Sequence, residues 1–156
     1  MHEILIIGTV PPCPRCKLLT GLAREMVKEM KLDAEVRHIA YTDPEAEQIG
    51  RTMGLTPGTA KDVAKVLGED VALDKMPKSS EVSPPAFLQN VDPYLKQFEQ
   101  LFREVNILDD WLRSFEDRAK EAGILMTPVF LVDGEMLHNG SVPEPERIRQ
   151  WLSQLQ

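Results

Sequence analysis

The chain has 156 residues, of which 42% are hydrophobic and 28% charged, and its 18 basic and 25 acidic residues give a net charge of −7. This length fits one domain, or one domain with an insertion, and the composition excludes a wholly disordered or fibrous protein. The negative charge argues against nucleic-acid and anionic-membrane partners, which bind basic surfaces. No apolar run approaches the roughly 18 residues that span a bilayer. The first residues lack the basic region and cleavage site of a signal peptide, so we expect a cytoplasmic protein.

The first 40 residues predict a strand, a helix and a second strand. Residues 4–10 are apolar except for Gly8 and Thr9, which is typical of a strand buried on both faces. Residues 34–40 form a second extended segment. Between the two strands, apolar residues recur at helical spacing: Leu19, Leu22, Ala23, Met26, Val27 and Met30. This order predicts a right-handed βαβ unit.

The middle of the chain shows helical patterns separated by turns. Capping residues and glycines mark most of their ends. We expect a helix over 45–53 that ends at Gly54, and a second helix that begins with a Thr59–Asp62 capping box and ends before Gly68. An irregular stretch over 69–91 follows. Two more helices are expected after it: one begins at Asp92 and Pro93, and the other is capped by Asp109 or Asp110 and ends near Gly123.

The C-terminal part predicts a β-hairpin followed by a helix. Residues 129–132 are a short apolar strand, and Asp133-Gly134 is a strong signal for a two-residue hairpin turn. Residues 136–138 return antiparallel to that strand. Pro145 suits the first turn of the final helix.

The two cysteines of the chain, Cys13 and Cys16, lie between the first strand and the first helix. A disulfide between residues three apart constrains very little of the chain, so this spacing suits chemistry better than stability. With Cys13 at the N-cap and Pro14 at the first helical position, the unpaired N–H groups and the helix dipole favour the thiolate of Cys13. Arg15 is expected to tune its pKa as a nearby cation. Cys16 lies one turn further on, where it can close a disulfide with Cys13.

Two other interpretations of the cysteine pair remain open. A zinc site needs two more ligands, and the three histidines, His2, His38 and His138, are dispersed without ligand spacing. The cysteines could also be two buried, unreactive thiols.

Thr127-Pro128 directly precedes the strand over 129–132. With this proline, the order of elements and the Cys-Pro-Arg-Cys motif, the chain resembles the thioredoxin superfamily. It looks most like the small archaeal and bacterial thioredoxin-like redox-active disulfide proteins. The resemblance implies an α/β fold in which a βαβ…ββα sheet has flanking helices. It also implies that Pro128 is a cis-proline beside the disulfide and that the backbone of Thr127 holds substrate as an added strand.

The resemblance covers residues 1–42 and 107–156, and residues 43–106 are interpreted as a helical insertion. DsbA-type oxidoreductases carry an insertion in a similar place. The apolar stripes of the inserted segment either pack on the sheet or select a protein partner. Pro12 replaces the tryptophan that typical thioredoxins have before the first cysteine. Residues 4–7 also lack the buried carboxylate of thioredoxins, which leaves no proton acceptor for Cys16.

The function implied by the resemblance is that of a thiol–disulfide oxidoreductase. Cys13 is the expected nucleophile and Cys16 the resolving thiol. The expected partners are proteins with disulfides, together with a dithiol or flavin-dependent reductase, and no metal or organic cofactor is required. The alternative is a non-catalytic module that senses redox state or binds a partner on the same fold.

Overall fold

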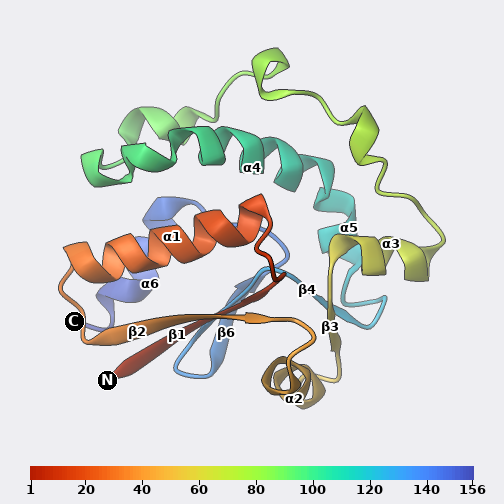
Figure 1. Cartoon of the computed structure of the whole chain (residues 1–156), viewed down its shortest axis with the longest axis horizontal. Helices are drawn as coiled ribbons and strands as arrows, with labels where there is room; N and C mark the ends of the chain where they lie inside the picture. Colours follow the sequence, from red (N-terminus) through yellow and green to blue (C-terminus); the bar gives the residue numbers. More distant parts are fainter.

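The computed structural model describes all 156 residues and contains a four-stranded mixed sheet with the strand order β2-β1-β5-β6 (Figure 1). β1 is parallel to β2 and antiparallel to β5, which is antiparallel to β6. A separate pair, β3 and β4, is parallel. The strands are β1 (His2–Gly8), β2 (Ala34–Ala40), β3 (Thr56–Gly58), β4 (Ile124–Met126), β5 (Val129–Val132) and β6 (Glu135–Asn139).

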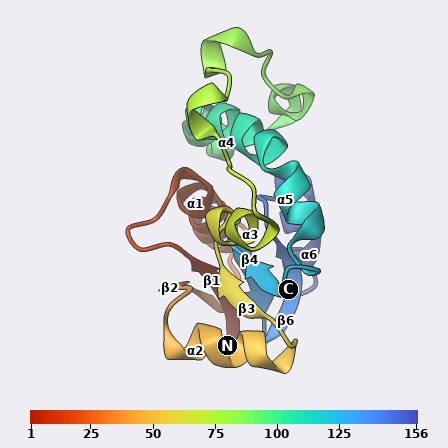
Figure 2. The ribbon, with the colours of Figure 1, turned by 90° about the vertical axis from the view of Figure 1, so that its right-hand side faces the viewer.

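Six α-helices surround the sheet: α1 (Pro14–Glu29), α2 (Pro44–Thr52), α3 (Ala60–Leu67), α4 (Glu99–Trp111), α5 (Arg113–Arg118) and α6 (Pro145–Ser153). Helices α1 and α6 cover one face, α2 covers the other, and α4 packs on the outside of α1 (Figures 1 and 2). No helix combines the length and the apolar composition needed to cross a membrane.

The alternation of side chains along β1 explains this layering. Ile4 and Ile6 face the core beneath α1, whereas Leu5 and Ile7 face the core beside α2. Both sets are buried, as the continuous apolar run predicts. The sequence also predicted β2, β5, the hairpin and the final helix. In the hairpin, Asp133 and Gly134 both have positive φ angles, 49° and 82°, as a type I′ turn requires.

One prediction about the segment before α5 was wrong. Asp109 and Asp110 do not cap a helix, because α4 runs through both residues to Trp111. The expected boundary between residues 106 and 107 therefore lies inside α4. The reason is that the buried face of α4 continues past that point, from Phe102 and Val105 to Asp109.

The inserted segment is not wholly helical. It contains β3, a strand of three residues that is too short and too rich in Pro and Gly to be recognised by alternation. It continues into α3, which packs with α5 and β4 in a small second core (Figure 2). The expected capping box between Thr59 and Asp62 is present at the start of α3. The stretch expected to be irregular contains the 3₁₀ helices η1 (Leu73–Lys75), η2 (Ser79–Glu81) and η3 (Ala86–Asn90), and η4 (Pro93–Phe98) precedes α4.

Candidate active site

The two cysteines lie together at the N-terminus of α1. Cys13 is the N-cap residue, with extended backbone angles, and Pro14 occupies the first turn. Cys13 is partly exposed, whereas Cys16 is fully buried. Their sulfur atoms are 3.5 Å apart and not bonded to each other. The sequence therefore placed this pair correctly relative to the helix.

The surroundings of the two sulfurs separate their pKa values. A hydrogen bond from the Cys16 thiol is the main cause that lowers the pKa of Cys13 to about 5, and the backbone N–H groups of Cys16 and Arg15 and the Thr9 side chain contribute in the same direction. Burial opposes this shift. The same hydrogen bond, burial and the negative charge of the Cys13 thiolate raise the pKa of Cys16. Cys13 is therefore the thiolate of the pair, and Cys16 holds its proton.

The Arg15 side chain does not act on Cys13 in the expected way. It is 4% exposed, and its Nε donates to Asp109 Oδ1 at 2.8 Å, while its Nη2 donates to the Gly140 carbonyl. The Asp109 carboxylate also accepts the Val142 N–H at 3.0 Å. Among the leading causes that shift the pKa of Cys13, Arg15 acts through its backbone N–H. The guanidinium instead attaches the start of α1 to α4 and to the loop after β6.

Three further residues around the sulfurs were missed as site residues by the sequence reasoning. The Thr9 hydroxyl accepts the Cys13 N–H at 2.9 Å and lies 4.0 Å from the sulfur of Cys16. A Cβ atom at Gly8 would lie 2.3 Å from Cys16 Sγ and 3.0 Å from His38 Nε2, so only glycine fits this position. The one available signal was the Gly8-Thr9 break in the apolar run before the cysteines.

Thr127 lines the same cleft as Cys13, and the peptide bond between Thr127 and Pro128 is cis, as the resemblance implied. Thr127 is 4% exposed. Its N–H donates to the Gly58 carbonyl of β3 at 2.9 Å. The N–H group of Thr127 is therefore already paired with β3, and the role of its backbone toward a substrate stays a prediction.

A cleft of about 340 Å³ opens beside Cys13. One wall comes from Thr9, the start of α1 and Thr127, and the other comes from α3, the segment after it, and the end of α4. The cleft therefore brings together Cys13, Pro14, Arg15 and Thr127 of the expected site, but its lining does not include Cys16 or Pro128. Its remaining lining residues are Thr9, Thr59, Ala60, Lys61, Val71, Leu73, Leu108 and Leu112.

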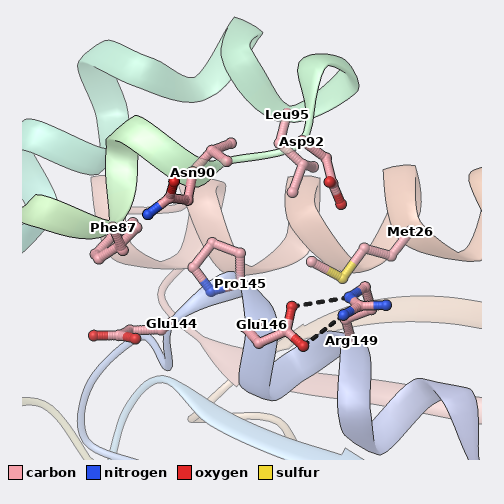
Figure 3. A pocket seen from close by; sticks show the side chains of 10 residues that line it. Met26, Phe87, Asn90, Asp92, Leu95, Glu144, Pro145, Glu146 and Arg149 are labelled. Carbon is pink, nitrogen blue, oxygen red and sulfur yellow. Dashed lines mark hydrogen bonds and ion pairs between the residues drawn. The ribbon is translucent and has the colours of Figure 1, made fainter.

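A second cavity, of about 200 Å³, lies between η3, η4, α1 and α6 (Figure 3). Its lining includes Phe87, Met26 and an ion pair between Glu146 and Arg149. Met26 is 13 residues from Cys13 along the chain, which is about 20 Å at the rise of an α-helix. This cavity is therefore separate from the cysteines.

His138 belongs to a different polar cluster, in which its Nε2 lies 2.9 Å from the Ser141 hydroxyl, which donates to Glu116 at 3.1 Å. Burial, followed by the charges of nearby arginines, lowers the pKa of His138 from 6.5 to about 4. Between these two pH values the unfolded chain binds a proton at this residue and the folded chain does not. The free energy of unfolding is therefore expected to fall as the pH drops from 6.5 to 4, by about 2–3 kcal/mol.

A His138→Gln variant is expected to lose this part of the pH dependence, because glutamine cannot take up a proton and still reaches Ser141. Urea unfolding at a series of pH values measures the change. His2→Gln, which removes a histidine at the far end of β1, serves as the control and is expected to keep the slope of the wild type. If His138→Gln kept the same dependence of unfolding free energy on pH as the wild type, His138 would not be the group responsible for it.

The similarity to a known protein family lies in the C-terminal part of the chain and does not include the cysteines. Residues 110–153 match the family model described as "Thioredoxin domain". This range contains β4, the cis-proline, the hairpin and all of α6, while β1, α1 and β2 supply the βαβ unit of the fold. The chain has the fold of the thioredoxin superfamily. The matched range of this thioredoxin-like protein does not include Cys13 or Cys16.

Among solved structures, the thioredoxin-like chain is similar to the oxidoreductase DsbA from Xylella fastidiosa. The two are 19% identical, and the alignment covers 98% of this chain and 84% of that chain with a TM-score of 0.35. No curated protein matches the sequence.

Proposed function

We propose that this thioredoxin-like protein is a thiol–disulfide oxidoreductase that reacts with disulfides of proteins through Cys13 and Cys16. The observation that carries the proposal is the pair of sulfurs 3.5 Å apart at the N-terminus of α1. One is a partly exposed thiolate, and the other is a buried thiol that holds its proton. A thiolate is the attacking form in thiol–disulfide exchange, and a neighbouring thiol is needed to release the product.

The proposed reaction has two steps. The Cys13 thiolate attacks one sulfur of a substrate disulfide, a mixed disulfide forms, and the first substrate sulfur leaves as a thiolate that takes a proton from solvent. Cys16 then loses its proton and attacks Cys13 Sγ, and the second substrate sulfur leaves. Two protein thiols are oxidised to a disulfide while one substrate disulfide is reduced to two thiols. The cleft beside Cys13 can accommodate apolar substrate side chains, since Val71, Leu73 and Leu112 line it.

The proposal includes a cytoplasmic location and a dithiol or flavin-dependent reductase that restores the two thiols. Under these conditions the protein serves as a reductant of protein disulfides.

An insulin-reduction assay with two variants tests the proposal. Cys13→Ser is expected to abolish turnover, because no nucleophile remains. Cys16→Ser is expected to stop after the first step and to accumulate a mixed disulfide on Cys13, which intact mass spectrometry detects. Equal activity in both variants would refute the assignment. Absence of turnover in the wild type, with a disulfide that forms reversibly, would favour a redox-sensing module.

A further inference from the structure

The resolving step of the proposed reaction requires a group that removes the proton from Cys16. Cys16 Sγ is fully buried, so bulk water does not reach it. No acidic side chain lies on β1 between Ile4 and Gly8. The residues around the sulfur therefore have to supply the acceptor.

His38 provides a ring nitrogen at this position. In the register of the parallel strands, His38 pairs with Ile6, and the following pair on the same face is Gly8 with Ala40. The side chain of His38 therefore projects to the face that α1 covers, next to the end of β1. A Cβ at Gly8 would lie 2.3 Å from Cys16 Sγ and 3.0 Å from His38 Nε2, so both atoms adjoin the same small space above the glycine.

The Nε2 atom of His38 is also without a partner. It is buried and makes no hydrogen bond within the protein. A buried polar atom that is left unpaired costs free energy, and such atoms often have a functional role. The residue as a whole is partly exposed, which leaves a route by which a proton can pass from the site to solvent.

We propose that His38 accepts the proton of Cys16 when Cys16 resolves the mixed disulfide. This inference rests on the proposed function. The imidazole carries its hydrogen on Nδ1 and presents the lone pair of Nε2 to the thiol. The Cys16 proton moves to Nε2, the sulfur electron pair forms the bond to Cys13 Sγ, and the bond from Cys13 to the substrate sulfur breaks. The imidazolium then gives its proton to the leaving thiolate or to solvent.

The charges around His38 agree with this role. Burial and the positive charge of Arg24 on α1 lower the pKa of His38, and the Cys13 thiolate acts in the opposite direction, so the imidazole is neutral and able to accept a proton near pH 7. Formation of the mixed disulfide removes the negative charge of Cys13. The two effects of Cys13 that raise the pKa of Cys16 then disappear, and only burial still raises it. Cys16 therefore becomes a stronger acid at the moment when it has to react.

Reaction of the reduced protein with dithiobisnitrobenzoate separates the two steps. The first thionitrobenzoate is released when Cys13 attacks, and the second is released when Cys16 resolves the mixed disulfide. His38→Gln is expected to leave the first release unchanged and to slow the second by about 100-fold, the lower end of what a positioned acid–base group contributes. The wild-type rate of the second release is expected to level off above the pKa of His38, whereas the rate of the variant keeps rising with pH.

His2→Gln is the matched control, because it removes an imidazole that contacts Asp133 and not the sulfurs. It is expected to release both equivalents at wild-type rates. An unchanged second release in His38→Gln would overturn the role of His38, as would an equal slowing of both releases, which indicates a structural effect. Failure of the wild type to release the second equivalent would instead overturn the proposed function.

Discussion

Alkylation of Cys13 by iodoacetamide is expected to reach half of its maximal rate near pH 5, four units below an unperturbed thiol with a pKa of 9.0. At pH 6 this shift raises the thiolate fraction roughly 1,000-fold, and the lower nucleophilicity of a less basic sulfur offsets about 60-fold of it. The net rate at pH 6 is therefore expected to exceed that of an ordinary exposed thiol by roughly tenfold. Mass spectrometry of the labelled protein across pH measures both quantities.

Two substitutions at Cys16 test the cause of this shift. The thiol of Cys16 is the main group that stabilises the Cys13 thiolate. Cys16→Ala removes the hydrogen-bond donor and is expected to raise the midpoint of Cys13 alkylation by about 1–2 pH units. Cys16→Ser retains a donor and is expected to give a smaller rise. A midpoint that stays near 5 in Cys16→Ala would show that the helix N-terminus alone stabilises the thiolate.

Asp109→Asn is expected to reduce the free energy of unfolding by about 3–5 kcal/mol. Arg15 and Asp109 are 4% and 6% exposed, so the substitution leaves a buried guanidinium without a counter-charge. An asparagine offers one oxygen, whereas the carboxylate accepts from both Arg15 and the Val142 N–H. Burial raises the pKa of Asp109, and the positive charge of Arg15 opposes that rise. The ionised carboxylate of Asp109 is therefore stabilised by Arg15. Urea denaturation followed by circular dichroism measures the loss.

Asp110→Asn provides the control, because Asp110 is the neighbour of Asp109 in α4 and its side chain is 70% exposed. Its unfolding free energy is expected to stay within about 0.5 kcal/mol of the wild type.

A double variant, Arg15→Leu with Asp109→Leu, removes both charges and is expected to recover most of the lost stability. Its midpoint of Cys13 alkylation is expected to stay near 5, because Arg15 acts on that pKa through its backbone N–H, which leucine keeps. A loss below 0.5 kcal/mol in Asp109→Asn would contradict the importance of the pair.

The parts of the fold that the sequence predicted correctly are those with strong local signals. Continuous apolar residues marked β1, Asp133-Gly134 marked the hairpin, and the two cysteines before a helical stripe marked the start of α1. Each of these signals lies within a few residues of the feature that it predicts, because the feature is determined by interactions between residues that are close in the sequence.

The parts that could not be predicted depend on contacts between distant segments. β3 has three residues, and its pairing with β4 joins positions 68 residues apart. Aspartate is a common N-cap residue, so the sequence favours a helix start at Asp109. In the structure Asp109 lies within α4 instead, where it is buried and paired with Arg15. The approach of His38 to Cys16 depends on the register between β1 and β2 and on the absence of a side chain at Gly8.

The ion pair between Arg15 and Asp109 has a consequence for engineering. It joins Arg15, which directly precedes Cys16, to the helix in which the inserted segment ends. Chimeras that exchange residues 43–106 between related proteins would cut α4 three residues before its charged anchor. A chimera is therefore expected to keep the geometry of Cys13 and Cys16 only if the exchanged segment includes all of α4, to Trp111. The segment to exchange is then defined by the end of this helix and not by the loop before it.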